Sequence, residues 1–171
     1  REEAIMTTLS NKMQDALNRQ INAEFHSSYL YLSMASYLQS INLPGSGAWM
    51  RMQAQEEHQH AMKIIDYVEH RLGRVFLSSI DGPTTEWTSV LDVFEDAFKN
   101  EQDVTKMIHD LVNLAADEKD HATSTFLQWY VNEQVEEEAT ADEIIQKLKM
   151  AGGTPSGLLF IDSDLGKRGL E

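Results

Sequence analysis

Apolar residues recur at alternating spacings of three and four along four long stretches of the chain, which is the spacing of amphipathic helices. Pro and Gly interrupt this pattern at only a few places. The pattern predicts long helices over about 9–40, 46–72, 89–116 and 120–150, followed by a short helix over about 156–165. Thr8 or Ser10 is the expected N-cap of the first helix, and Gly73 the expected left-handed residue that follows the second.

The similar lengths of the four long helices favour a four-helix bundle. Short loops join the first helix to the second and the third to the fourth, so each of these pairs is expected to be antiparallel. The connection over about 74–87 contains Pro83 and no helical period, and it is long enough to run the length of the bundle. The predicted fold is therefore all-α: a four-helix bundle over about 9–150 with one long crossover and a short fifth C-terminal helix. One domain over 1–171 is expected.

Composition narrows the classes of function. The 171 residues include 14 Lys+Arg and 28 Asp+Glu, for a net charge of −14, and 42% are hydrophobic. Such acidity argues against nucleic-acid binding, which needs a basic surface, and no apolar run is long enough to span a membrane. The absence of cysteine excludes disulfides and thiolate metal sites and fits a reducing cytoplasm. A cytoplasmic protein without a nucleic-acid or membrane partner is expected.

The core-facing seam of each long helix is apolar at both ends and ionisable near its middle. Each seam carries one glutamate there: Glu24, Glu57, Glu101 and Glu137. His60 lies one turn after Glu57, and Gln134 lies one turn before Glu137. Packing the helices side by side would bring these groups to one level of the bundle.

Four carboxylates in a dry core require positive charge, because an unpaired buried carboxylate is very costly. The seams offer no Lys or Arg at that level, so a pair of divalent cations is the expected partner. Oxygen and nitrogen donors without sulfur suit iron or manganese, although zinc also binds such a set. The alternative is a polar layer that only fixes the register of the helices and binds no metal.

Three stretches around these residues carry a family resemblance. They are Asn18–Glu24 (NRQINAE), Gln55–Ala61 (QEEHQHA) and Phe126–Gln134 (FLQWYVNEQ). In these motifs, and from about residue 8 to 165, the chain resembles the prokaryotic (bacterial and archaeal) non-haem ferritins. The resemblance implies an iron-storage ferritin with a di-iron ferroxidase centre inside each subunit. Such a protein oxidises Fe(II) with O₂ or H₂O₂ and stores ferric mineral in a hollow homo-oligomeric shell of 24 subunits.

The resemblance also implies roles for individual residues. One iron would be held by Glu24, Glu57 and His60. The second would be held by Glu57 as a bridge, Glu101 and Glu137, with Gln134 close by. A possible third iron site would use Glu56, Glu133 and Glu136. Tyr31 matches a tyrosine beside the centre that could donate an electron during oxygen reduction, and Trp129 matches a nearby aromatic residue.

Departures from related families sharpen this prediction. Bacterioferritins place a haem-ligating Met where this chain has His58, so no haem is expected. Bacterioferritins and rubrerythrins also carry a second Glu-x-x-His motif, whose histidine position is Thr140 here, and the Cys-rich iron module of rubrerythrins is absent. A di-iron or di-manganese oxidase or peroxidase that stores no metal is the alternative function, and particle size would separate the two.

Overall fold

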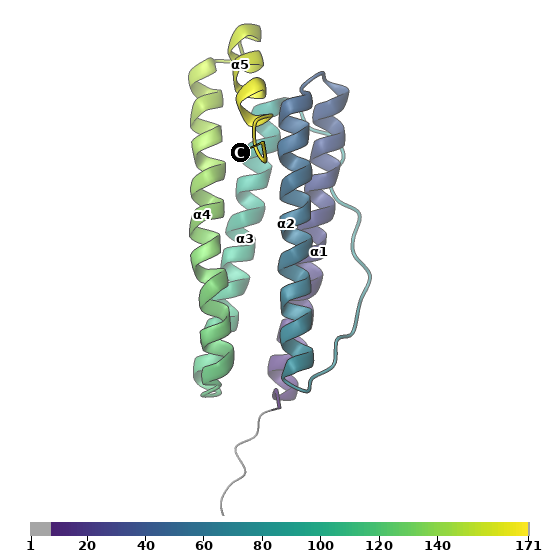
Figure 1. The fold of residues 1–171 in the computed structure, drawn as a ribbon, viewed down its shortest axis with the longest axis vertical. Helices are drawn as coiled ribbons and strands as arrows, with labels where there is room; N and C mark the ends of the chain where they lie inside the picture. The colour runs from purple at the N-terminus through teal and green to yellow at the C-terminus, as the bar shows by residue number, and fades with distance from the viewer. Residues whose placement is uncertain (1–7, 171) are drawn as a thin grey trace, which may run out of the picture.

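The computed structural model describes residues 8–170, and they form an elongated bundle of helices (Figure 1). The helices are α1 (Asn11–Ser40), α2 (Pro44–His70), α3 (Val90–Asp117), α4 (His121–Ala151) and α5 (Pro155–Leu165). No residue of the described part lies in a β-strand. The all-α fold and its five helices agree with the sequence prediction, with each boundary within two residues of the expected one. None of these helices is both long and apolar enough to cross a membrane.

The connections give the predicted topology. Short loops join α1 to α2 and α3 to α4, and each of these pairs packs antiparallel. The segment 71–89 runs without helical structure along α1, from one end of the bundle to the other (Figure 1). Because this crossover returns the chain to the end where α2 begins, α2 and α3 run in the same direction.

Side chains of α1 hold the crossover against the bundle. The Asn18 side chain donates to the carbonyl of Arg74 at 3.0 Å and accepts from the backbone N–H of Phe76 at 2.6 Å. One turn later, Asn22 donates to the carbonyl of Ser79 at 3.0 Å. These amides satisfy backbone groups that have no partner within the crossover itself.

The helix ends show which capping predictions hold. Ser10, rather than Thr8, caps α1, with its hydroxyl accepting from the N–H of Met13 at 3.0 Å. Gly73 does not take the left-handed conformation after α2; Leu72 does, with φ 57°. Gly73 is instead a point of close packing, because a Cβ there would lie 3.0 Å from a methyl group of Val68.

The N-terminus of α2 is capped by α5, which the sequence did not predict. Leu43, at the N-cap position, makes no side-chain cap. The buried Asp162 carboxylate accepts from the N–H of Gly45 at 3.1 Å and of Ser46 at 2.7 Å. A carboxylate at this position satisfies free N–H groups and interacts favourably with the helix dipole. It also fixes α5 against the start of α2.

The apolar core is divided into two parts by a polar layer. One cluster, which includes Met34 and Phe94, lies toward the end where α5 packs, and the other, which includes Met13 and Ile108, lies toward the opposite end. Between them the glutamates of the four predicted seams are buried. Near the end of α2, Val68 takes the fully buried position, and its neighbour Tyr67 is half-buried.

Candidate metal centre

The polar layer brings together ionisable side chains from all four long helices. Three groups have possible ligand atoms within 4.8 Å of one another: Glu24, Glu57 and His60; Glu57, Glu101 and Glu137; and His60, Glu133 and Glu137. We call Glu24, Glu57, His60, Glu101 and Glu137 the central cluster. Glu57, His60 and Glu137 each belong to two of the groups, so the three groups overlap.

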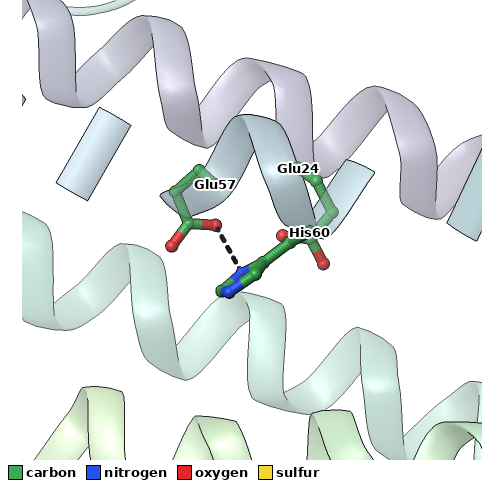
Figure 2. A group of neighbouring side chains, drawn as sticks. All are labelled: Glu24, Glu57 and His60. Atoms are coloured by element: carbon green, nitrogen blue, oxygen red, sulfur yellow. Dashed lines mark ion pairs between the residues drawn. The ribbon is translucent and has the colours of Figure 1, made fainter. Parts of the chain in front are cut away.

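On the α1–α2 side, Glu24, Glu57 and His60 point into the same space (Figure 2). Glu57 and His60 are three residues apart on α2, and Nδ1 of His60 lies 3.5 Å from Oε2 of Glu57. Three buried atoms here have no hydrogen-bond partner: Glu24 Oε2, Glu57 Oε1 and His60 Nδ1. Buried polar atoms are almost always paired, so these three point to a ligand.

On the α3–α4 side, hydrogen bonds orient the carboxylates. The Tyr31 hydroxyl donates to the carboxylate of Glu101. The Gln134 amide donates to Oε2 of Glu101 at 3.0 Å, so it helps to position that carboxylate. The Gln53 amide donates to Oε2 of Glu137 at 2.5 Å. These donors fix the ligand atoms without neutralising them.

Burial governs the protonation of the cluster. It raises the pKa of Glu24 to about 7 and that of Glu137 to about 8, from 4.5. Burial and the neighbouring carboxylates raise the pKa of Glu57 well above its usual value. For Glu101, burial outweighs the hydrogen bonds, and its pKa is also raised. Without a cation, the cluster therefore favours protonated carboxyl groups near neutral pH.

Burial lowers the pKa of the histidine in the cluster, whereas it raises the pKa values of the glutamates. Burial, together with the charge of Lys63, lowers the pKa of His60 to about 4. The imidazole is consequently neutral at physiological pH, which is the form that binds a metal. No lysine or arginine among residues 8–170 forms an ion pair with a glutamate of the central cluster.

The three candidate ligands of a third iron lie on α2 and α4 and are more exposed. We call Glu56, Glu133 and Glu136 the outer carboxylates. Glu133 lies closest to the centre, with Oε1 3.8 Å from Nε2 of His60. Burial raises the pKa of Glu133, and the charges of Glu136 and Glu56 raise it further. Glu136 is exposed, and Glu56 pairs with Arg168.

Aromatic residues border the centre. Tyr31 is almost completely buried and contacts Glu101, as described above. The ring of Trp129 packs edge-on against His60, with 5.3 Å between centroids, and Lys63 Nζ lies 3.4 Å from the Trp129 centroid. His58 points away from the cluster: it is exposed, and its ring lies 5.4 Å from that of Phe25.

Several supporting residues were missed by sequence reasoning. Gln20, one turn before Glu24, donates to Oε1 of that glutamate at 2.8 Å. Tyr130 donates to the backbone carbonyl of His60 at 2.7 Å. The i, i+4 spacing of Gln20 and Glu24 could have revealed the first contact. The second joins α4 to α2, and only the packed structure shows it.

This donor set suits a hard or borderline cation. Carboxylate oxygens and one neutral imidazole can hold two divalent ions that share Glu57 between them. Cationic charge would neutralise the buried carboxylates and occupy the three unpartnered atoms, so the residues present fit iron. Together, the helical bundle with its crossover and the internal carboxylate cluster define the class of four-helix proteins with a metal centre in the core.

Comparison with known proteins gives the family. A family model described as the Ferritin-like domain matches residues 14–151. A bacterial non-heme ferritin of Bacteroides fragilis is 48% identical over 160 residues, covering 94% of this chain and 99% of the relative. One from Campylobacter jejuni is 42% identical over 154 residues, covering 90% and 92%.

A solved structure gives the same result. The open-pore ferritin of the hyperthermophilic archaeon Archaeoglobus fulgidus is 55% identical, and the match covers 95% of this chain and 99% of that one with a TM-score of 0.94. The chain belongs to the ferritin family, and the resemblance to prokaryotic non-haem ferritins seen in its motifs is confirmed.

Proposed function

We propose that this protein is an iron-storage ferritin that oxidises Fe(II) at the central cluster. One observation carries the proposal most directly: Glu24 Oε2, Glu57 Oε1 and His60 Nδ1 are buried, lie in one group of possible ligands and have no hydrogen-bond partner. Leaving such atoms unpaired is costly, and two bound iron ions would pair them.

The proposed ligands follow the three groups. Glu24, Glu57 and His60 bind one iron; Glu57, Glu101 and Glu137 bind the second. Gln134 and Tyr31 orient Glu101 by hydrogen bonds. Tyr31 is also placed to supply an electron, since its hydroxyl contacts a ligand of the second iron. The outer carboxylates would form a third site; of the three, Glu133 is the one that belongs to a possible ligand group among residues 8–170, together with His60 and Glu137.

The chemistry is an oxidation of the bound substrate. Each Fe(II) gives one electron to O₂ or H₂O₂. Anionic oxygen ligands favour the product Fe(III), because they stabilise the higher charge. The protein positions two iron ions side by side and excludes bulk water. It also holds Glu101 and Glu137 in place through Tyr31, Gln134 and Gln53.

Storage requires a shell. Membership in the ferritin family supports iron storage, and we propose a homo-oligomer of 24 copies in the cytoplasm. Exposed apolar side chains on the crossover and on α5 are available for contacts between copies: Phe76, Leu77, Ile80, Leu159 and Phe160. The net charge of −14 would attract iron cations toward the assembly.

Retention of oxidised iron tests the proposal. Metal-free protein is given excess Fe(II) in air, passed through a size-exclusion column, and analysed for iron and particle size. We expect a large particle that retains far more iron than the about two or three ions per chain that the ligand sets can hold. Iron limited to that number in a small oligomer would indicate instead a di-iron oxidase or peroxidase that stores no metal.

A further inference from the structure

The segment that follows α5 brings a cation to the edge of the metal centre. Nη1 of Arg168 donates to Oε1 of Gln53 at 2.9 Å, and Nη2 donates to Oε2 of Glu56 at 2.6 Å. The guanidinium carbon lies 4.6 Å from the ring centroid of Trp49. Trp49, Gln53 and Glu56 follow one another at spacings of four and three, so they share one face of α2. Arg168 lies along that face.

The position of Arg168 is built into the fold. α5 is fixed to the start of α2 by its buried carboxylate cap, as described above. Gly166 then passes so close to α2 that a Cβ on it would lie 3.1 Å from Cα of Gly45. Gly169 takes a φ of 81°, and a Cβ there would lie 2.9 Å from the side chain of Met52. Two glycines thus let the segment turn and lie against α2.

Through Gln53, the arginine is connected to the central cluster. The Gln53 carbonyl accepts from Arg168, while its NH₂ group donates to Glu137. Glu56 also acts on the cluster, because its negative charge raises the pKa of Glu137 and of Glu133. Pairing with Arg168 reduces that repulsion. A divalent cation bound to Glu56 would reduce the same repulsion, so the guanidinium has the electrostatic effect that such a cation would have.

We propose that Arg168 is a built-in counter-ion that pairs with Glu56 while the outer carboxylates hold no metal. A divalent cation that binds there displaces the guanidinium from Glu56 and releases the segment 166–170 from α2. The inference rests on the proposed function, since it assigns a regulator to the third iron site. According to this proposal, the segment 166–170 is ordered against α2 when the outer carboxylates are free of metal and is released when they bind it.

The exposure of the pair allows this exchange. The side chains of Arg168 and Glu56 are 24% and 41% exposed, so water screens their attraction. A divalent cation carries twice the charge of the guanidinium and would also be attracted by Glu133 and Glu136, whose charges act on the same place, whereas Arg168 pairs only with Glu56 among the outer carboxylates. Metal binding should therefore displace Arg168 from Glu56. Breaking this ion pair lowers the affinity of the outer carboxylates for the metal.

Zinc binding to the full-length, metal-free protein tests the proposal, because Zn(II) binds oxygen and nitrogen donors and undergoes no redox reaction. Calorimetric titration gives the number of sites and their affinities for the wild type, Arg168→Gln and Glu56→Gln. Lys167→Gln is the matched control, since Lys167 is the adjacent exposed cation and its one ion pair among residues 8–170 is with Asp164 in α5. Hydrogen exchange of the backbone amides of 166–170 is followed during the same titration.

The inference predicts that Arg168→Gln tightens the third, weaker site about two- to fivefold and leaves the two tighter sites unchanged. It also predicts faster exchange in 166–170 of the wild type as the third zinc binds, with no such change in Glu56→Gln. Lys167→Gln should bind zinc as the wild type does.

Two outcomes would overturn the inference alone: two tight sites without a third, or a third site whose affinity and effect on 166–170 do not depend on Arg168. Failure of zinc to bind at the two tight sites would overturn the proposed function and this inference together.

Discussion

At the scale of single residues, the buried glutamates make the metal-free protein sensitive to pH. The pKa of Glu24 is raised to about 7 and that of Glu137 to about 8 in the folded state, against 4.5 for the free side chain. Above pH 4.5 the unfolded chain releases these protons, while the folded chain retains them up to pH 7 or 8. Their contribution to stability is therefore complete below pH 4.5 and is lost as the pH rises through 7 and 8.

His60 opposes this trend only at lower pH. Its pKa of about 4 in the folded state lies below the free value of 6.5. His60 therefore makes the folded state more stable as the pH rises from 4 to 6.5, and it adds no further change above pH 6.5. Between pH 6.5 and 8 we expect the free energy of unfolding of the metal-free protein to fall by on the order of 1–2 kcal/mol.

Denaturant unfolding at several pH values, with and without zinc, measures the pH effect. The zinc-loaded protein should lose little stability over this range, because the metal holds the carboxylates in their charged form. A metal-free protein that becomes more stable between pH 6.5 and 8 would contradict the assigned protonation.

The bridging position of Glu57 leads to a second prediction at this scale. Glu57→Gln replaces a buried, unpaired carboxylate by a neutral group of similar shape. We expect the metal-free variant at pH 8 to be more stable than the wild type by about 1–3 kcal/mol, because the Gln amide is buried without the cost of either protonating the carboxyl group at that pH or burying its charge. Zinc should no longer stabilise it, because both proposed ions lose a ligand.

Thermal unfolding with and without zinc provides the measurement, and Glu69→Gln, an exposed position on α2, is the control. A Glu57→Gln variant that is less stable than the wild type but keeps its response to zinc would show that Glu57 serves only the packing of the bundle.

At the scale of helices, one carboxylate joins α5 to the start of α2. Asp162 accepts from the N–H groups of Gly45 and Ser46 and from the Ser46 hydroxyl at 2.8 Å. Asp162→Ala leaves the first turn of α2 without a cap, and we expect it to lower the free energy of unfolding by about 1–3 kcal/mol.

Asp164→Ala is the matched control for this cap. Asp164 lies on the same helix, is about half exposed and pairs with lysines at 3.9–4.0 Å, so its removal should have an effect below about 0.5 kcal/mol. Equal losses of stability in the two variants, measured by denaturant unfolding, would show that the cap is unimportant.

The helices also show what sequence reasoning can and cannot reach. Periodicity and breakers located all five helices, because each amphipathic face is a local property of the sequence. The mid-seam glutamates Glu24 and Glu101 were identified for the same reason. The cap by Asp162 and the contact of Arg168 with Glu56 join residues more than a hundred positions apart. Such contacts depend on how the helices pack, which no local pattern encodes.

At the scale of the whole molecule, the exposed apolar residues predict assembly. Leu77, on the crossover, is 74% exposed and lies beside Phe76. A single chain gains nothing by exposing such residues to water, but an oligomer buries them between copies. We expect Leu77→Asp to shift the particle toward smaller species in size-exclusion chromatography with light scattering.

Thr85→Asp adds the same charge to an exposed polar position of the same crossover and should leave the particle size unchanged. If the wild type is already a monomer, or if both variants assemble as the wild type does, the crossover is not a contact between copies.

The most direct measurement is a titration of the metal-free protein with Fe(II) in air, followed by absorbance in the wild type and in Glu57→Gln. The account predicts fast oxidation in the wild type that saturates at about two to three iron ions per chain, followed by slower uptake. The fast phase should be absent in Glu57→Gln. A wild type that oxidises Fe(II) no faster than buffer, or a variant that retains the fast phase, would contradict the claim that the central cluster is the ferroxidase centre.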